Sequence, residues 1–198
     1  LLAALEKSSG RDLSDWGSQW LRTTGLNTLR PDFEVDENGK FTRFAVEQGG
    51  AEPGAGEHRV HRIAVGIYDD ADGKLVRTER VEIDLEASAS TEVPALVGVS
   101  RGKLVLVNDD DLTYCSVRLD PESLSTLLAR IGDIAEPLPR TLAWSAAWEM
   151  TRQAEMKARD FAGLVLSGIG TETEVGVMQR LLLQAQTAIT AYAEPSWA

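Results

Sequence analysis

The chain has 198 residues, of which 43% are hydrophobic and 26% are charged, and its formal net charge is −11. This composition is that of a folded globular protein, and the acidic excess disfavours nucleic acids and anionic membrane surfaces as partners. No apolar run approaches the ~20 residues needed to cross a bilayer. Neither a leader peptide nor an initiator methionine is visible at Leu1, and with Cys115 as the single cysteine we expect a cytoplasmic protein without a disulfide.

The first 27 residues predict two short helices. Ser8-Ser9-Gly10 interrupts an apolar helical face, and a second helix is expected to begin at residue 12 or 13. Trp16 and Trp20 are four residues apart and therefore share one face of that helix, and Gly25 suits a left-handed C-cap. Paired tryptophans can line a ligand surface, but we favour a face that packs on other structure.

From residue 28 to residue 119 the hydrophobic period changes to two, which predicts β-strands. Asn38-Gly39 lies between two alternating stretches, and this dipeptide is the strongest short-range signal for a hairpin. Further strands are expected at about residues 63–67, 75–85, 91–96, 103–107 and 113–119. Short strands at this spacing are typical of an antiparallel β-sandwich rather than of parallel βαβ units.

From residue 120 onward the period is helical. Asp120 followed by Pro121 predicts a helix start, with the aspartate as N-cap and the proline at the first helical position. Three more helices are expected at about residues 138–154, 158–167 and 174–192, and their short loops predict antiparallel neighbours. We therefore expect an α+β, multidomain chain: a short N-terminal helical segment (1–27), an antiparallel β-sandwich (28–119) and a C-terminal antiparallel helical array (120–198).

His58 and His61 are the only histidines and hence the first candidates for a metal site. They are three residues apart at an expected strand start, where an odd spacing sends two side chains to opposite faces. The spacing also differs from the HExxH arrangement, in which the histidines are four residues apart. We expect polar surface residues here, with a metal site as the less favoured alternative.

Asn108-Asp109-Asp110-Asp111 is the acidic run most like a cation loop. It lacks the alternating oxygens, central glycine and terminal glutamate of an EF-hand, so we expect a solvated turn whose Asx side chains bond local backbone. Weak binding of calcium by this loop is the alternative. Cys115 is expected to be a buried structural thiol in a strand, because no basic neighbour favours its thiolate. A hydrolase that uses Cys115 is the alternative.

Three stretches carry a family resemblance. They are Ser9-Gly10-Arg11-Asp12-Leu13 through Trp16, Trp20-Leu21 and Gly25-Leu26-Asn27-Thr28-Leu29; Leu104 to Tyr114 with Arg118-Leu119-Asp120; and Leu138 to Trp144 with Trp148-Glu149-Met150. In this order they resemble the zinc aminopeptidase N family, and most closely its bacterial cytosolic type. The resemblance implies the end of a catalytic domain, a β-sandwich domain and the start of a C-terminal helical domain.

The resemblance further implies a parent metallopeptidase that removes N-terminal residues from peptides. In the family, one Zn²⁺ is held by two histidines of an HExxH helix and a more distant glutamate. These motifs do not occur in this sequence, so we assign no catalytic, metal-binding or substrate-binding residue and no cofactor to the segment. It is expected to be a noncatalytic interdomain scaffold, with the parent's catalytic domain and remaining helical domain as intramolecular partners.

Structural, interdomain roles are expected for five aromatic residues: Trp16, Trp20, Tyr114, Trp144 and Trp148. The first two should seat the N-terminal helices on the sandwich or on the catalytic domain. The alternative function is a stand-alone β-sandwich module that binds a ligand. Exposed apolar faces near residues 1–5 and on the last helix would favour the fragment, whereas a uniformly polar surface would favour the module.

Overall fold

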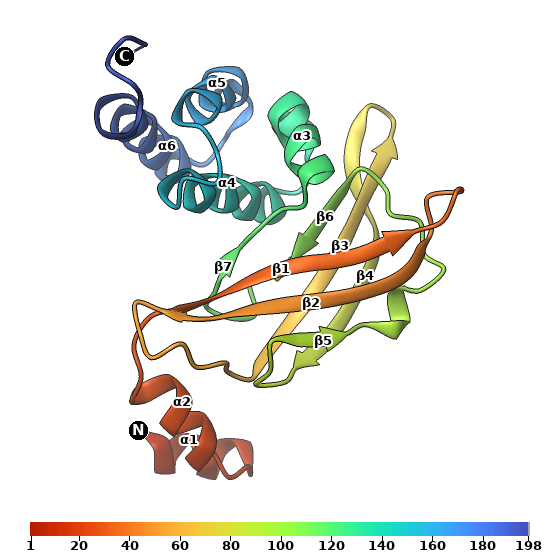
Figure 1. Ribbon diagram of the computed structural model, residues 1–198, viewed down its shortest axis with the longest axis vertical. Helices are drawn as coiled ribbons and strands as arrows, with labels where there is room; N and C mark the ends of the chain where they lie inside the picture. The colour runs from red at the N-terminus through yellow and green to blue at the C-terminus, as the bar shows by residue number, and fades with distance from the viewer. Residues whose placement is uncertain (198) are drawn as a thin grey trace.

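The structure is a computed structural model that describes residues 1–197, with helices at both ends of the chain and two β-sheets between them (Figure 1). The helices are α1 (Leu2–Ser9), α2 (Ser14–Leu21), α3 (Pro121–Arg130), α4 (Pro137–Arg152), α5 (Ala158–Gly168) and α6 (Val175–Thr187). The strands are β1 (Leu26–Val35), β2 (Phe41–Glu52), β3 (His61–Ala71), β4 (Lys74–Leu85), β5 (Ser90–Glu92), β6 (Leu104–Val107) and β7 (Ser116–Val117). The predicted α+β class is confirmed.

The strands form a four-stranded sheet in the order β5-β2-β1-β7 and a three-stranded sheet in the order β4-β3-β6. Neighbouring strands are antiparallel except β1 and β7, which pair in parallel. The β1–β2 hairpin turns at Asn38-Gly39 as predicted, and Gly39 has a φ of 72°, which glycine adopts without steric cost.

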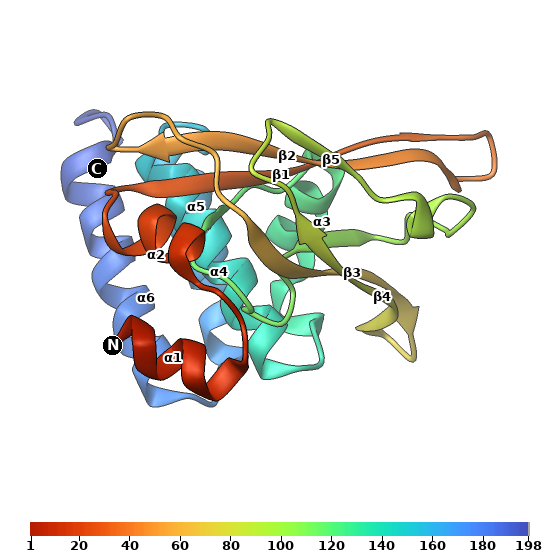
Figure 2. The ribbon, with the colours of Figure 1, turned by 90° about the horizontal axis from the view of Figure 1, so that it is seen from below.

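Two hydrophobic cores hold these elements together. The first lies between the sheets and joins Leu29 and Phe44 of one sheet to Ile63 and Val65 of the other. The second joins the three-stranded sheet to the helical array α3–α6. The pair α1–α2 lies at the opposite end of the molecule and contributes to neither core (Figures 1 and 2).

The helical array begins as the sequence predicts. The carboxylate of Asp120 accepts hydrogen bonds from the backbone N–H groups of Glu122 and Ser123, both at 3.1 Å, and Pro121 is the first residue of α3. The predicted helices at 138–154 and 158–167 correspond to α4 and α5. The last predicted helix is α-helical to Thr187 and continues as a π-helical turn over Ala188–Tyr192.

The predicted C-cap at Gly25 is wrong. Helix α2 ends at Leu21, four residues earlier, and Gly25 instead leads into β1 with a φ of 81°. A Cβ atom at Gly25 would lie 2.6 Å from the carbonyl oxygen of Pro53, so this close approach requires glycine there. The left-handed glycine cap belongs to α1, where the N–H of Gly10 donates to the carbonyl of Glu6.

Two predicted strands are shorter than expected. The strand at 91–96 ends at Glu92, and Pro94 begins a 3₁₀ turn because proline has no N–H to donate to a ladder. The strand at 113–119 is reduced to β7, since the backbone of Thr113 is bound to the side chain of Asn108 instead of to a neighbouring strand. Cys115 therefore lies outside a strand.

Candidate functional site

Arg59 is a charged residue buried at the junction between α2 and the sheets. It lies in the loop before β3 with 2% of its surface exposed. Its guanidinium group donates hydrogen bonds to the backbone carbonyls of Gln19 at 3.0 Å, Thr24 at 2.9 Å and Gly25 at 3.0 Å. One side chain thus satisfies the end of α2 and the linker to β1, both of which would otherwise leave carbonyl groups without donors.

The loop that carries Arg59 is itself fixed to the neighbouring strand and helix. The N–H of Arg59 donates to the side-chain oxygen of Gln48 on β2 at 2.7 Å, and the Gln48 amide donates back to the Arg59 carbonyl at 3.0 Å. The N–H of Val60 donates to the side chain of Gln19 at 3.0 Å. These bonds fix the backbone of the loop and thereby position the Arg59 side chain against the linker.

Trp20 provides the apolar part of the same junction. The Arg59 guanidinium carbon lies 5.1 Å from the centre of the half-buried Trp20 ring, within cation–π range. The His61 ring contacts the same indole edge-on, with 5.1 Å between ring centres. Trp16 is also half-buried on α2, and the adjacent Gly17 is buried against the side chain of Leu2 of α1. We name Trp20, Arg59 and His61, with the linker residues 22–25, the Arg59 junction.

The expectation that His61 is a polar surface residue is wrong. It is 4% exposed, with Nδ1 2.9 Å from the hydroxyl of Thr113 and Nε2 buried without a hydrogen-bond partner among the described residues. Burial, together with the positive charge of Arg59, lowers the pKa of His61 to about 4. His58, by contrast, lies half-buried in the loop and is not part of this cluster.

Acidification should weaken this junction. Because folded His61 has a pKa of about 4 and an unfolded histidine one near 6.5, the folded state binds the proton less readily, and stability falls as the pH decreases between these values. Between about pH 7 and about pH 4.5 we expect this residue to cost about 2 kcal/mol of unfolding free energy. Urea unfolding at both pH values measures it. His61→Gln should lack this pH-dependent loss of stability, whereas His58→Gln should show it like the unsubstituted protein. Equal pH dependence in the two variants and the unsubstituted protein would contradict the assignment of the loss to His61.

The acidic run is a structural loop rather than a solvated turn. Asp109 is completely buried and accepts hydrogen bonds from the Tyr68 hydroxyl at 2.5 Å and from Arg77 at 2.7 Å. Burial raises the pKa of Asp109, and the bonds from Tyr68 and Arg77 oppose that rise. The predicted Asx bonding is correct for Asn108, whose side chain accepts from the N–H of Leu112. Within residues 1–197, no three His, Cys, Asp or Glu side chains gather as metal ligands.

Gly66 on β3 makes room for this buried carboxylate. A Cβ atom at Gly66 would lie 2.2 Å from a carboxylate oxygen of Asp109, so Gly66→Ala must displace a fully buried charge. We expect a loss of about 1–3 kcal/mol or more in thermal or urea unfolding. Gly163 in α5 is the matched control, since a Cβ there meets nothing within 4 Å and helix propensity favours alanine. An unchanged stability in Gly66→Ala would contradict the close packing.

A second buried arginine joins the sheets to the helical array. Arg101 is 6% exposed and donates at 2.5 Å to Asp120, the N-cap of α3. The hydroxyl of Ser123, which is fully buried, accepts the N–H of Val105 in β6 at 2.9 Å. The start of α3 is thus bonded directly to a strand of the three-stranded sheet.

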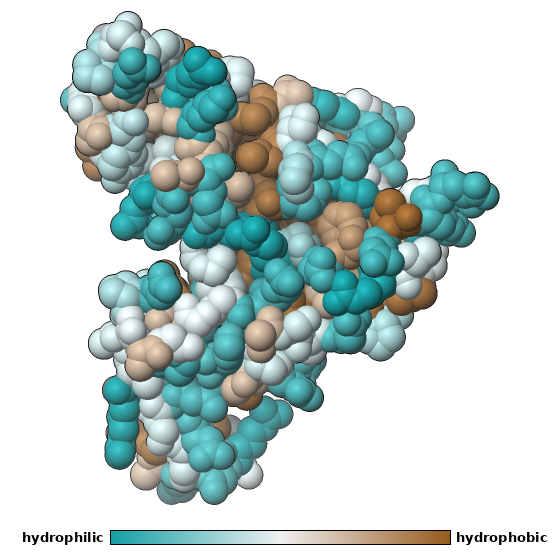
Figure 3. Space-filling model, in the orientation of Figure 1, coloured by the Kyte–Doolittle hydropathy of each residue, from teal (hydrophilic) through white to brown (hydrophobic). Residues whose placement is uncertain are grey.

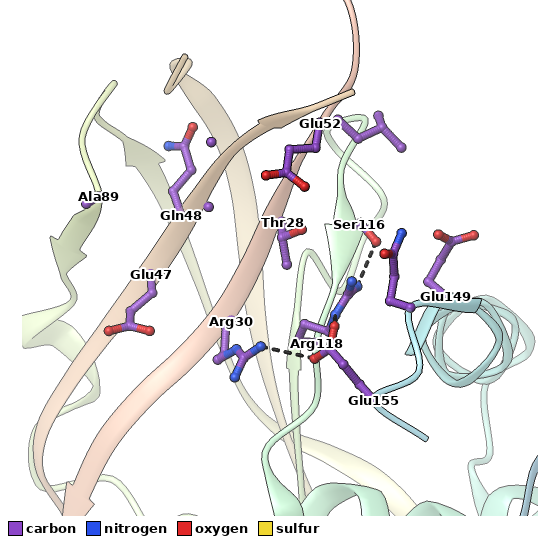
Figure 4. A pocket seen from close by; sticks show the side chains of 14 residues that line it. Thr28, Arg30, Glu47, Gln48, Glu52, Ala89, Ser116, Arg118, Glu149 and Glu155 are labelled. Atoms are coloured by element: carbon purple, nitrogen blue, oxygen red, sulfur yellow. Dashed lines mark hydrogen bonds and ion pairs between the residues drawn. The ribbon is translucent and has the colours of Figure 1, made fainter. Parts of the chain in front are cut away.

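A polar cleft of about 570 Å³ lies between the β1–β2 surface and the end of α4 (Figure 4). Arg118 Nε and Arg30 Nη2 both donate to Glu155, at 2.5 Å and 3.1 Å, across the cleft wall. Glu47 and Glu52 also line it. Both arginines form ion pairs with the same carboxylate. These pairs connect β1 and the residue after β7 to the loop between α4 and α5. The space-filling view shows this cleft as a notch below the helical array (Figure 3).

The other aromatic candidates differ in their surroundings. Trp144 is buried, and its indole N–H donates to Glu172 at 2.7 Å. Trp148 packs on Phe161, with 5.3 Å between ring centres. Tyr114 is 72% exposed. The first two belong to the packing of the helical array itself, and the structure does not bring any of these three to Trp16 and Trp20.

Cys115 has the properties of an unreactive thiol. It is partly buried, and burial, reinforced by the charge of Asp111, raises its pKa to about 12. A thiol with so high a pKa carries almost no thiolate at neutral pH, and the thiolate is the nucleophile. This favours the structural role over the alternative of a cysteine hydrolase.

Sequence reasoning missed the buried arginines Arg59, Arg101 and Arg118. Nothing in the sequence around them distinguishes them from ordinary surface arginines. Their partners are backbone carbonyls and carboxylates far along the chain, so no local pattern identifies them.

Comparisons with known proteins find similarity over nearly the whole chain. Residues 104–198 match the family model described as the ERAP1-like C-terminal domain. The chain is 50% identical over 202 residues to the Aminopeptidase N of Streptomyces lividans, an alignment that covers 99% of this chain and 24% of that protein. The chain thus spans about a quarter of the length of this curated relative. Among the described residues, none of the helices has the length and apolar character required to span a membrane.

Proposed function

We propose, from the premise that this chain is a segment of an aminopeptidase N, that it is the noncatalytic scaffold between the catalytic domain and the C-terminal helical domain of that enzyme. The observation that carries the proposal is the Arg59 junction, where one buried guanidinium binds three carbonyl groups at the end of α2 and in the linker to β1. Such a junction sets the angle at which α1 and α2 leave the sheets.

The proposal divides the chain into three parts. Residues 1–27 form the end of the catalytic domain, residues 28–119 the β-sandwich domain, and residues 120–198 the start of the helical domain. Trp16 and Trp20 seat the first part on the second. The single cysteine fits a reducing, cytoplasmic compartment.

The parent enzyme in this proposal is a zinc-dependent hydrolase that removes N-terminal residues from peptides. Zinc in such an enzyme polarises a water molecule and the scissile carbonyl. The residues described here do not fit a zinc site, because the ligand-type side chains nowhere gather in threes within residues 1–197 and the buried His61 faces Trp20. We therefore derive no catalytic step from this segment.

Exposed apolar side chains on the helical array support the scaffold over a stand-alone binding module. Leu166 of α5 is 83% exposed, and Leu182 and Leu183 of α6 are 60% and 64% exposed. Leu1, next to α1, is 85% exposed. Single exposed leucines are common, but several on the helical array, together with Leu1 at the other end, favour surfaces that pack on further structure.

The experiment combines this chain with the longer enzyme that contains it. The purified chain should bind zinc only substoichiometrically and should not hydrolyse aminoacyl chromogenic substrates; zinc-dependent turnover by the chain would overturn the proposal. In the longer enzyme, Arg59→Ala should lower kcat/KM while zinc remains stoichiometric, and the exposed Arg62→Ala should leave both unchanged. Loss of zinc from the Arg59 variant would instead place this segment in the metal site and contradict a scaffold role.

A further inference from the structure

We propose that the two sheets and the helical array form one cooperative unit, so that the movable joint of residues 1–197 is the linker between α2 and β1, held closed by Arg59. The inference does not depend on the aminopeptidase assignment, because every contact that supports it lies within this chain. It goes beyond the scaffold role by stating which parts of the scaffold move together.

Strand β6 is shared by both halves. It forms the edge of the three-stranded sheet through four antiparallel pairs with β3, from Tyr68↔Leu104 to Val65↔Val107. Its side chains alternate between two cores: Val105 and Val107 belong to the core between the sheets, whereas Leu104 and Leu106 belong to the core under the helices. Separating the halves would divide a strand that both cores need.

The core under the helices is continuous from sheet to array. Tyr68 of β3 and Leu75 of β4 belong to the same buried cluster as Leu127 of α3 and Trp144 of α4. All four side chains are 2% exposed or less. We call this contact between the three-stranded sheet and the helical array the seam. Opening the seam would expose several fully buried side chains to water, at a cost of roughly 1.5–3 kcal/mol for each.

Polar bonds close the same seam. The N–H of Val105 has its acceptor in the Ser123 hydroxyl of α3, and the N–H of Ala135 donates to the carbonyl of Leu75 in β4 at 3.1 Å. Arg130 of α3 pairs with Asp70 of β3 at 2.6 Å. Movement of the helical array away from the sheet would break the bond at β6, which is buried, and the bond at β4.

The family match also places β6 with the helices. It begins at residue 104, the first residue of β6, and therefore includes this strand together with the helices. The pair α1–α2 differs in every respect, since none of its residues belongs to either hydrophobic core and Gly17 is its single buried residue. Apart from the covalent linker, the Arg59 junction and the hydrogen bond from Val60 to the Gln19 side chain connect it to the sheets.

Native-state hydrogen exchange of the full chain, followed by mass spectrometry in increasing urea, tests the proposal. Phe161→Leu alters only the helical core, and Phe44→Leu alters only the core between the sheets. If the unit is cooperative, each variant should lower protection about tenfold in β3 and in α4 alike. Leu2→Ala, within α1–α2, should lower protection only in residues 1–25.

Protection that falls only in the half that carries the substitution, or two urea transitions within residues 26–197, would overturn the proposal. A Leu2→Ala effect that spreads to β3 would contradict the placement of the joint. If a phenylalanine variant does not fold, Val65→Ala and Val165→Ala repeat the comparison with smaller changes in the same two cores.

Discussion

Replacing Arg59 with alanine is expected to lower the free energy of unfolding by about 3–5 kcal/mol, because it removes several hydrogen bonds from a charged group, each of which contributes about 1.5–3 kcal/mol. The substitution leaves the carbonyls of Gln19, Thr24 and Gly25 without their donor and removes the cation over Trp20. These three hydrogen bonds are partly buried, so water replaces them only in part after the substitution. Urea unfolding, monitored by circular dichroism, measures the loss.

Arg62 provides the matched control for this experiment. It lies three residues further on, its side chain is 52% exposed, and it pairs with Glu82 and Asp84 on the sheet surface. Exposed pairs contribute about 0–1 kcal/mol, so Arg62→Ala should be nearly neutral. We also expect Arg59→Ala, but not Arg62→Ala, to make the linker at residues 22–25 sensitive to protease under native conditions. Equal losses in the two variants would show that Arg59 is not a specific junction residue.

Replacing Glu172 with alanine is the second change with a large expected effect, about 3–5 kcal/mol. The Glu172 side chain is 1% exposed and accepts at 2.7 Å from both Arg140 and the Trp144 indole. Its removal leaves a nearly buried guanidinium without a counter-charge and a buried N–H without an acceptor. Thermal unfolding, with tryptophan fluorescence as the readout, follows the loss at Trp144.

Two variants separate the causes of this loss. Glu172→Gln keeps an acceptor oxygen and the shape of the side chain. It should therefore avoid the loss of stability that comes from the unpaired Trp144 indole, but not the loss that comes from the unpaired charge of Arg140. Glu149→Ala breaks the more exposed pair with Arg152 and should cost less than about 1 kcal/mol. If Glu172→Ala were as mild as Glu149→Ala, the buried pair would not be what holds the loop after α5 to α4.

The regular elements were predictable because their signals are local. The hairpin between β1 and β2 follows from Asn38-Gly39, in which Gly39 adopts the positive φ, and the start of α3 follows from Asp120 and Pro121. The lengths of the short strands were not predictable in this way. Strand β7 has only two residues because Asn108, five positions before Thr113, binds the backbone that would otherwise extend it.

Period, caps and turn residues act over a few positions, so the order and class of the helices and strands and the likeness to aminopeptidase N could be read from the amino-acid sequence. Which charges are buried depends on contacts between distant parts of the chain. Arg59 meets the carbonyl of Gln19 from 40 positions away, Asp109 meets Tyr68 from 41, and Arg140 meets Glu172 from 32. A charged side chain enters a protein interior only where partners satisfy it, and here those partners are assembled by the fold.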